Sequence, residues 1–555
     1  MTSRLLFILT FISVFTFSTQ AQTLAFPTAE GFGAYASGGR GGKVVEVTNL
    51  EDDGTNPSEG SLRWALQQHP GEPITVIFKV SGIIDLNAQL RCKRNGFTIA
   101  GQTAPGDGIC IRGNKVNFGG STNFIIRHLR FRVGVKVSAS GLGSIGIENA
   151  SNFILDHCTF GWSGEENMTI YDNTLTTIQW CIVHEGLYHS THDKGNRGYG
   201  SQWGGQSATY HHNLLAHNYS RSPRFNGARS NDINVLIDYV NNVNYNWGKQ
   251  NAPYGGDIDA KGKTHRVNMV NNYHKPGPAR PANKSSYFVQ SSYHKEQTPS
   301  KVAVWWMDGN IMEGNEASTN NNYLALDRSQ YPAEVRDQMI ASEPFEVPYA
   351  VKTETAEQAF ASVLAGAGAF PRDRVDARIV DEVETGTAAG SGTLGQNLGI
   401  IDDPEVVGGY PDYETRDVPL DSDKDGMPDA WETENGLNPN DPADGNKLTV
   451  SGYTALEAYL NGLVGEEIEL DFGTSITSEK SNNNVLYFLN GDVLNLSSEK
   501  PVSAIRILDT LGRTRTSRSG NIQTVNLSDL PAGVYILEVT HDDNGKFVAK
   551  INKSK

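Results

Sequence analysis

The sequence has few cysteines, no excess of positive charge and no long apolar run beyond its first residues. Four cysteines in 555 residues are too few for a fold that depends on disulfides. Aspartate and glutamate (63) outnumber lysine and arginine (47), which gives a net charge of −16. Because nucleic-acid-binding proteins normally carry a basic face, we expect no nucleic-acid partner. An acidic chain can still bind a polyanion through a local basic cleft or a bridging divalent cation.

The one apolar run, at the N-terminus, has the form of a secretory signal. Arg4 supplies the positive start, Leu5–Phe17 the apolar stretch and Thr19–Ala21 a small-residue cleavage site. The run is too short to span a bilayer. We therefore expect residues 1–21 to be removed and the remainder to be secreted or held at the cell surface.

Three short β-rich runs recur in the centre of the chain, ~25–30 residues apart, and a fixed period of this size is typical of a parallel β-solenoid. The runs are Asn152–Phe160, Thr176–Val183 and Ala208–Ala216, each followed by a polar loop. We interpret them as one strand per coil, with functional residues in the loops on one side. Asparagines near the strand ends can adopt left-handed turns and hydrogen-bond their counterparts in the next coil; they are Asn213, Asn241, Asn242, Asn271 and Asn272.

The predicted fold is all-β. A right-handed parallel β-helix is followed by a small calcium-binding helical segment and a small C-terminal β-sandwich. Composition places the boundaries at residues 22–415 for the β-helix, 416–465 for the calcium-binding segment, 466–483 for a linker and 484–555 for the C-terminal domain.

Few segments have a helical pattern. Ser61–Gln68 is amphipathic and would cover the first coil, and Tyr453–Leu463 would pack beside the calcium-binding loop. The glycine-rich Gly38–Gly42 lacks a phosphate-loop pattern and is interpreted as a tight turn.

Cys158 and Cys181 occupy equivalent places in successive coils, where stacked thiols and a disulfide are both compatible with the spacing.

Residues 421–432 read DSDKDGMPDAWE and fit the calcium-loop pattern D-x-[DN]-x-[DN]-G-x5-E. A solvated acidic turn is the alternative interpretation. We expect a structural Ca²⁺ site, because no nucleophile or acid–base partner accompanies the loop. The predicted ligands are Asp421, Asp423, Asp425, the carbonyl of Met427, Asp429 through water, and Glu432.

The run Ala208–Ala216 leads into a loop that reads SRSPRF and carries Arg221 and Arg224. Uronate polymers can be cut by β-elimination, in which a base removes the C5 proton beside the carboxylate and a cation stabilises the developing charge. An arginine can be that base only if neighbouring cations and a dry cleft lower its pKa. Lys194 and Arg197 in a nearby loop would add to this crowding. Arginines with a purely structural role are the alternative.

Histidines are concentrated in the same part of the chain. His211 and His212 adjoin on a strand, where neighbouring side chains point to opposite faces, so we expect no zinc site there. Asp156 and His157 end a strand, where either structural hydrogen bonding or catalysis is compatible with their position. We expect His189 and His192 to line the cleft.

Taken together, these stretches resemble polysaccharide lyase family 1, the pectate lyases, of the secreted bacterial kind. The matching segments are FPTAEGFGAYASGGRGGKVVEVTNL, TIAGQTAPGDGI, NFILDHCTF, HSTHDKG, TYHHNLLAHNYSRSPRF and PRDRVDARIVDEV. The resemblance implies a right-handed parallel β-helix and calcium-assisted β-elimination on pectate, a (1→4)-α-D-galacturonan, giving 4,5-unsaturated oligogalacturonides. The family's catalytic arginine precedes x-Pro after the HHN run, which is Arg221 here. Substrate-binding roles are expected for Arg224, His189, His192 and Lys194.

The sequence departs from the family pattern at two places. Many members carry a second arginine five residues after the catalytic one, where this chain has Asn226, and a calcium-binding aspartate of the family corresponds to the region of Gly143. Glu165 and Glu166, with Asp172 as a third, are the carboxylates that remain for an active-site Ca²⁺.

Three other functions are therefore considered. A pectin lyase would act on methyl-esterified chains without calcium. A glycoside hydrolase would need two carboxylates flanking the bond, and no convincing aspartate pair stands in the loops. A non-catalytic pectin-binding surface protein would bind without turnover.

The C-terminal segment resembles the sorting domain of type IX secretion. PVSAIRILDTLGR, NLSDLPAGVYILEV and the lysine-bearing end Lys546–Lys555 carry the resemblance. It implies passage across a Gram-negative outer membrane by the secretion machinery, followed by release or anchoring. We expect a monomer whose main partner is an acidic polysaccharide.

Overall fold

A computed structural model describes residues 23–135, 142–190, 192–249, 253–260, 262–280, 286–293, 301–472, 485–490, 492–498, 501–509, 512–520, 522–542 and 546–553. The predicted signal segment 1–21 and the later part of the predicted linker lie outside these residues. The chain forms two compact units, Met1–Asn446 with Tyr453–Ile468, and Lys447–Gly452 with Glu469–Lys555. Within the described ranges, no helix is long and apolar enough to cross a membrane.

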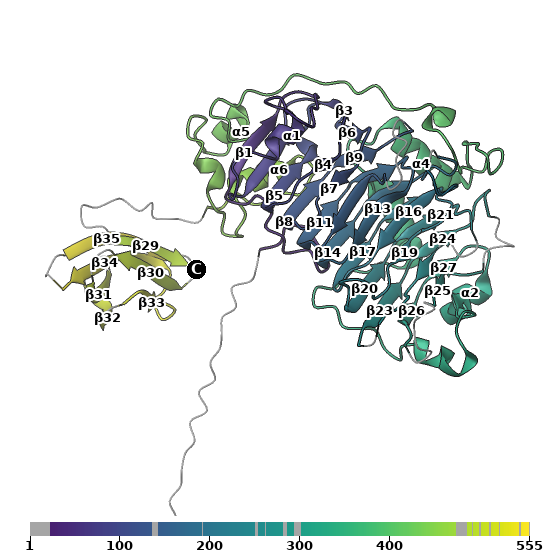
Figure 1. Ribbon diagram of the computed structural model, residues 1–555. Coiled ribbons are helices and arrows are strands. Elements are labelled where there is room, and N and C mark those ends of the chain that lie inside the picture. The colour runs from purple at the N-terminus through teal and green to yellow at the C-terminus, as the bar shows by residue number, and fades with distance from the viewer. Residues whose placement is uncertain are drawn as a thin grey trace, which may run out of the picture. The chain divides into compact units, whose positions relative to one another are not determined.

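The first unit is a parallel β-helix (Figure 1). Each coil passes through three parallel sheets in turn, here called A, B and C. The strands β11 (Ser151–Asp156), β12 (Thr159–Gly161) and β13 (Glu166–Tyr171) belong to A, B and C, and β14 (Thr174–Gln179) returns to A beside β11. The predicted β-helix is confirmed. The prediction of one strand per coil is wrong, because each β-rich run bends into two strands and a third follows the polar loop.

The other strands continue this order. Sheet A also contains β1 (Lys43–Val47), β2 (Ile74–Phe78), β5 (Asn95–Ala100), β8 (Thr122–Arg127), β17 (Ala208–His211), β20 (Asn234–Val240), β23 (Thr264–Val270) and β26 (Val304–Asp308). Sheet B also contains β3 (Gly82–Asp85), β6 (Ile109–Arg112), β9 (Leu129–Arg132), β15 (Ile182–His184), β18 (Leu214–Ala216), β21 (Val243–Tyr245), β24 (Tyr273–Lys275) and β27 (Ile311–Met312). Sheet C also contains β4 (Leu90–Arg91), β7 (Val116–Asn117), β10 (Ile145–Glu148), β16 (Tyr199–Trp203), β19 (Arg224–Phe225), β22 (Tyr254–Gly255), β25 (Val289–Ser291) and β28 (Leu326–Asp327).

One residue with a left-handed backbone forms the corner between sheets A and B in seven successive coils. Such a residue reverses the side-chain alternation of a strand and turns the chain sharply. Consecutive corner side chains stack, with 4.4 Å between the ring centroids of Trp180 and His212. The expectation that His211 and His212 face apart is wrong, because His212 occupies a corner and the two Nδ1 atoms lie 2.8 Å apart. The corner residues are His128, His157, Trp180, His212, Asn241, Asn271 and Gly309.

The residue after the corner points into the β-helix and forms a continuous ladder. Asn213 Nδ2 donates to Asn242 Oδ1 at 2.9 Å, Asn242 Nδ2 donates to Asn272 Oδ1 at 3.1 Å, and Asn272 Nδ2 donates to Asn310 Oδ1 at 2.8 Å. These asparagines are fully buried, so the ladder satisfies amides that would otherwise be costly to bury. The predicted asparagine pairing between coils is confirmed.

The same inward position is occupied by cysteine in two earlier coils. Cys158 and Cys181 are free and buried, as are Cys92 and Cys110, so stacked thiols are the correct interpretation. Burial raises the pKa of the Cys92 and Cys110 thiols to about 11. Thiols of this kind are inert and contribute through packing.

Aromatic and aliphatic side chains fill the interior of the coils. Phe97, Phe124 and Phe153 stack in register, with ring centroids 4.9 and 4.7 Å apart. The predicted N-terminal helix is α1 (Leu62–Ala65), which buries Leu62 in the same core and begins at Ser61, whose side chain accepts from the Trp64 N–H. The predicted turn at Gly38–Gly42 is present, since the Gly42 N–H donates to the Gly39 carbonyl at 2.9 Å.

Two helices that the sequence did not reveal cover sheet B. The buried side chains of α3 (Ala356–Gly366) and α4 (Arg374–Thr385) pack on strands β15, β18 and β21. The predicted second helix of the calcium-binding segment is α6 (Ala455–Gly462), which starts at a capping box of Thr454 and Glu457. The remaining helices are α2 (Glu316–Asn320), α5 (Asp429–Glu434) and the 3₁₀ turns η1 (Gly101–Thr103), η3 (Asn322–Ala325), η4 (Ala333–Met339), η5 (Pro404–Val407) and η6 (Asp444–Asn446).

The second unit contains two antiparallel sheets, as expected of a small sandwich. One consists of β29 (Val485–Asn490), β30 (Val493–Ser498) and β33 (Thr524–Asn526), and the other of β31 (Val502–Asp509), β32 (Thr514–Ser519), β34 (Gly533–His541) and β35 (Lys546–Lys553). Their inner faces share one apolar core that includes Leu494, Ile505 and Leu537. The predicted sandwich is confirmed.

Replacing Asn242 by alanine should destabilise the β-helix by about 2–4 kcal/mol, because each buried polar group left without a partner costs roughly 1–3 kcal/mol. The change removes the acceptor of both the Asn213 backbone N–H and its side-chain amide. Denaturant unfolding measures the loss. Asn234, exposed at the start of β20, is the matched control, and its alanine variant should lie within about 0.5 kcal/mol of wild type. Equal losses in the two variants would contradict a role for the ladder.

Candidate functional site

The connections from sheet B to sheet C form one flank of the β-helix and carry the predicted site. Glu165 and Glu166 lie at the start of β13, and residues 185–198 and 217–223 form the next two loops. Parallel pairing aligns these segments, since Glu166 is opposite Tyr199 and Tyr199 is opposite Ser220. Side chains that are 20 to 55 positions apart in sequence therefore meet on one surface.

Arg221 occupies a left-handed position, with φ of +55°, at the end of this alignment. Its carbonyl accepts from the Ser201 N–H at 2.7 Å, which fixes the backbone beside β16. The guanidinium lies 4.3 Å from the centroid of the Tyr199 ring and donates to Gln202 Oε1 at 3.2 Å. It also pairs with the Glu166 carboxylate. Only 15% of the Arg221 side chain is exposed.

The surroundings of Arg221 make its protonated form less favourable than in water. Burial lowers the pKa of the Arg221 guanidinium, and the positive charge of Arg224 lowers it further, while Tyr254 and Glu165 act in the opposite direction. Arg224 shares Gln202 Oε1 at 3.4 Å and also contacts Asp257 Oδ1 at 3.4 Å. The structure therefore brings Arg221 and Arg224 together.

The predicted calcium ligands of this flank are already paired with cationic side chains. Glu165 contacts His192 and Arg197, the latter at 3.3 Å, and Glu166 contacts Arg221. Calcium needs six to eight oxygens, several of them from carboxylates that are not neutralised by other groups. Glu165 and Glu166 do not fit that requirement in this arrangement.

Asp172 lies at the opposite end of β13 from Glu166. Its Oδ1 accepts from the backbone N–H groups of Asn231 and Asp232, both at 3.1 Å. The six-residue strand between them spans roughly 20 Å, so Asp172 does not join Glu165 and Glu166.

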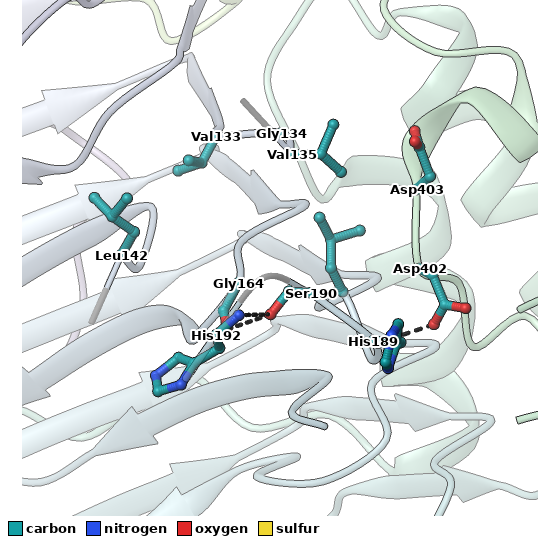
Figure 2. Close-up of a pocket in the computed structure, with 11 residues that line it drawn as sticks. Val133, Gly134, Val135, Leu142, Gly164, His189, Ser190, His192, Asp402 and Asp403 are labelled. Atoms are coloured by element: carbon teal, nitrogen blue, oxygen red, sulfur yellow. Dashed lines mark hydrogen bonds between the residues drawn. The ribbon is translucent and has the colours of Figure 1, made fainter. Parts of the chain in front are cut away.

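His189 and His192 lie beside a cavity of about 380 Å³ next to this cluster (Figure 2). The His189 N–H donates to Asp402 Oδ1 at 2.9 Å, and Ser190 Oγ donates to the Gly164 carbonyl at 3.3 Å. Arg221 is not among the residues that line the cavity. His192, which does line it, contacts Glu165, and the next residue, Glu166, contacts Arg221. The lining residues are Val133, Gly134, Val135, Leu142, Gly164, Leu187, His189, Ser190, His192, Asp402 and Asp403.

Lys194 lies at the exposed tip of the 185–198 loop. Its backbone N–H donates to His192 Nδ1 at 3.0 Å. The positive neighbour that lowers the pKa of Arg221 is Arg224, and Arg197 faces Glu165. Lys194 is therefore exposed to solvent and does not crowd Arg221.

Helix α4 anchors the loops of this flank through buried ion pairs that sequence reasoning missed. Arg132 contacts Asp373 at 2.6 Å and Asp376 at 2.7 Å, and Arg378 contacts Glu185 at 2.9 Å. Glu185 also accepts from Trp162 Nε1 at 2.9 Å, and it begins the loop that carries His189 and His192. The sequence signal that could have indicated these ion pairs is the spacing of the acidic residues in PRDRVDARIVDEV, which places them on one face of a helix.

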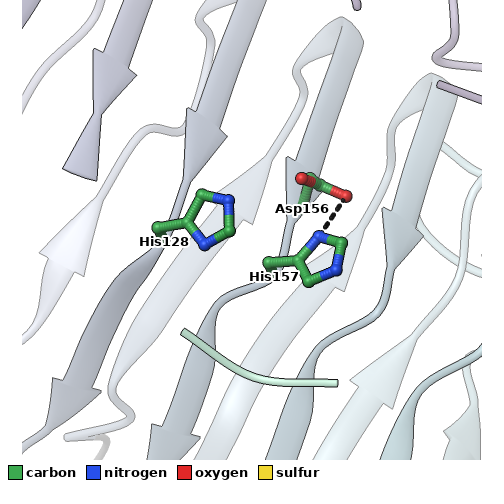
Figure 3. Close-up of side chains that lie close together, drawn as sticks. All are labelled: His128, Asp156 and His157. Atoms are coloured by element: carbon green, nitrogen blue, oxygen red, sulfur yellow. Dashed lines mark ion pairs between the residues drawn. The ribbon is translucent and has the colours of Figure 1, made fainter. Parts of the chain in front are cut away.

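The cluster of His128, Asp156 and His157 lies on the other side of sheet B, at the A–B corners (Figure 3). Asp156 accepts from Arg127 at 2.7 Å and from Gln179 at 2.7 Å, and pairs with His157. Burial opposes ionisation of Asp156, but Arg127 holds its pKa well below its ordinary value. Structural hydrogen bonding, rather than catalysis, is therefore the interpretation that fits Asp156 and His157.

Comparison with known proteins gives long matches to one family. "Probable pectate lyase C" of Aspergillus flavus is 34% identical over 450 residues, covering 80% of this chain and 94% of the relative. The protein of the same name from Aspergillus fumigatus is 34% identical over 464 residues, covering 82% and 97%. The crystal structure of jun a 1 from cedar pollen aligns with 17% identity and a TM-score of 0.42, over 61% of this chain and 92% of that one. Residues 490–554 match the secretion system C-terminal sorting domain.

The β-helix and these long matches define a polysaccharide lyase. Within that class, the chain belongs to the pectate lyase family, with a C-terminal sorting domain of the type IX secretion system. The sorting domain supports secretion or attachment to the cell surface.

Replacing Glu185 by glutamine should destabilise the protein by about 3–5 kcal/mol at pH 7, as when one partner of a buried ion pair is removed. Burial alone would raise the pKa of Glu185, but Arg378 and His184 hold it well below the ordinary 4.5. This contribution is present above pH 4.5 and is lost as the pH falls towards the folded pKa. The difference between wild type and variant should therefore shrink in acid.

Urea unfolding at several pH values measures this difference. Glu384→Gln, at an exposed position of α4, is the matched control and should change stability by less than about 0.5 kcal/mol. A Glu185→Gln deficit that stays constant down to pH 3 would contradict the ionic origin of the effect.

Proposed function

We propose that this chain cleaves pectate by β-elimination on the B–C flank, with Arg221 as the base. The observation that carries the proposal is the partly desolvated Arg221 guanidinium, whose pKa is lowered by burial and by Arg224. The names of the fungal relatives supply the substrate class.

The reaction needs one proton to move and one bond to break. Neutral Arg221 takes the proton from C5 of a galacturonate, the electron pair forms the C4–C5 double bond, and the C4–O bond breaks. The leaving oxygen is protonated by water, and the product carries a 4,5-unsaturated end. Tyr199 and Gln202 hold the guanidinium in place at 4.3 and 3.2 Å, which keeps the reacting group oriented before substrate arrives.

The substrate carboxylate is proposed to bind a second cation of this flank, Arg224. Arg224 lies beside Arg221 with 15% of its side chain exposed, and its planar donors suit a carboxylate. The ion pair between Arg221 and Glu166 favours the protonated guanidinium, so it has to open before Arg221 can act as a neutral base. His189, His192 and Lys194 are proposed to contact neighbouring sugar units along the same flank.

The structural features also bear on the alternatives. A pectin lyase would accept methyl-esterified chains, for which the charge of Arg224 has no carboxylate to meet. A hydrolase would need two carboxylates placed across the bond, and here Glu165 and Glu166 are ion-paired to cationic side chains. We further propose that the enzyme acts outside the cell after export.

Replacing Arg221 by alanine should lower kcat/KM on polygalacturonate by about 10²–10⁴-fold, the usual contribution of a general base. Arg221→Lys should also lose most activity, because an ammonium group cannot reproduce the planar contacts with Tyr199 and Gln202. The ultraviolet absorbance of the unsaturated product measures the rate. Arg266, on β23 of sheet A and stacked on Phe345, is the matched control, and Arg266→Ala should retain activity.

Unsaturated product formed at wild-type rates by folded Arg221→Ala would rule out this base. New reducing ends without ultraviolet absorbance would indicate a hydrolase. Binding of polygalacturonate by wild type with no product of either kind would indicate a non-catalytic protein.

Replacing Arg224 by glutamine should raise KM for polygalacturonate by about 10–100-fold, since a hydrogen bond to a charged group contributes roughly 1.5–3 kcal/mol. Highly methyl-esterified pectin should show a much smaller change, because its esters carry no charge. Equal effects on the two substrates would contradict a carboxylate-binding role. Arg266→Gln is the matched control for the loss of one arginine.

A further inference from the structure

The acidic loop at Asp421–Glu432 is not used by the proposed reaction and lies far along the β-helix from Arg221, at the first coils. The loop leads into α5, and α5 is followed by the short turn η6 and by α6. Figure 1 shows α5 and α6 beside β1 and α1. The role of this segment is therefore separate from catalysis at Arg221.

Carboxylates from three places converge in this segment. The ligand atoms of Asp421, Asp423 and Asp425 lie within 4.8 Å of one another, and so do those of Asp425, Glu432 and Asp444. Asp425 belongs to both groups, so the two form one cluster. Asp444 comes from η6, outside the sequence pattern, and is brought in because its Oδ2 accepts from the Asn438 N–H at 2.7 Å.

Several of these oxygens are buried without a hydrogen-bond partner. Glu432 is fully buried, and neither of its carboxylate oxygens has a partner. Asp425 is 4% exposed, and its Oδ2 also lacks one. Burying an unpaired carboxylate costs several kcal/mol, and a cluster of them repels itself. A bound cation would give these oxygens a partner and remove the repulsion.

Asp429 differs from its neighbours. Both of its oxygens are engaged by Ser422, whose N–H and hydroxyl each donate at 2.7 Å. It therefore closes the loop rather than facing the cluster, and the water-mediated role expected from the sequence pattern does not match this position. Asp444 supplies the additional carboxylate instead.

We propose that Asp423, Asp425, Glu432 and Asp444 bind one Ca²⁺ that fastens this segment onto the first coils of the β-helix. Asp421 lies beside them, where it is paired with Lys79. An all-oxygen, strongly anionic set suits calcium and not zinc. The fastened surface is the outer face of sheet A. Gly426, at the loop's sharp turn with φ of +97°, lies so close that a Cβ there would be 3.1 Å from Leu456 and 3.3 Å from Val44.

Polar contacts extend the same attachment to both sides of the loop. Lys79 after β2 contacts Asp421 at 2.9 Å, and Arg40 contacts Glu457 of α6 at 2.8 Å. Arg127 of β8 donates to Asn461 at 2.8 Å. Because the ligands come together only when this segment is folded, calcium binding stabilises the folded chain.

Terbium luminescence and calcium titration of the full chain test the site. Trp431 adjoins Glu432 in sequence, so it should sensitise bound Tb³⁺, and Ca²⁺ should displace the signal with a Kd of roughly 10⁻⁷–10⁻⁴ M. Glu432→Gln and Asp444→Asn should each weaken Ca²⁺ binding by about 10-fold or more, because ligand charge sets affinity. Asp429→Asn is the matched control and should bind as wild type does. Wild-type affinity in Asp444→Asn, or lost affinity in Asp429→Asn alone, would overturn the proposed ligand set.

Thermal unfolding of wild type gives a second measurement that does not depend on whether the variants fold. Chelation should lower the midpoint by about 3 °C or more, and Ca²⁺ but not equimolar Mg²⁺ should restore it. The Arg221→Ala variant should show the same shift, so failure of the proposed catalysis would leave this result unchanged. An unfolding midpoint of wild type that is indifferent to chelator and to Ca²⁺ would overturn the proposal.

Discussion

One left-handed residue at the A–B corner of each central coil is the constraint on which the rest of the structure depends. It bends every β-rich run at the same place, so successive coils superimpose and the following residue always points inward. The inward column becomes a ladder of asparagine amides, and the corner column becomes a stack of rings. With the corners in register, the polar loops after sheet B are in register as well. The alignment of Glu166, Tyr199 and Arg221 follows from that.

The flank that carries Arg221 is held by charges rather than by apolar packing alone. Ion pairs with α4 and its N-cap fix the start of these loops, and they involve Arg132 and Arg378. Within the flank, Glu165 is held by Arg197 and His192. Among these charges, Arg221 is paired with Glu166 and has 15% of its side chain exposed. Burial and the charge of Arg224 lower its pKa, which is the property that the proposed base requires.

The sequence was enough to predict the β-helix, the asparagine ladder, the sandwich and the acidic loop, because each has a local pattern. It was not enough to place the corners, since His212 and Asn241 adopt left-handed backbones only because neighbouring coils impose them. For the same reason it misjudged how His211 and His212 face each other. The partners of α4 and the approach of Asp444 to Glu432 join residues distant in sequence, and no local pattern encodes such a meeting.

The repeating corner also has a consequence for how such a chain can change over time. Successive coils pair through the same edge of backbone groups, and six of them place an asparagine or a cysteine at the same inward position. A whole turn can therefore be duplicated or lost with little disturbance to the turns on either side. The loop that carries Arg221 is a connection between strands of sheets B and C, and the repeating coils beneath it do not depend on its sequence. A different insertion between two of these bends would change the reactivity of the flank while the architecture beneath it stays the same.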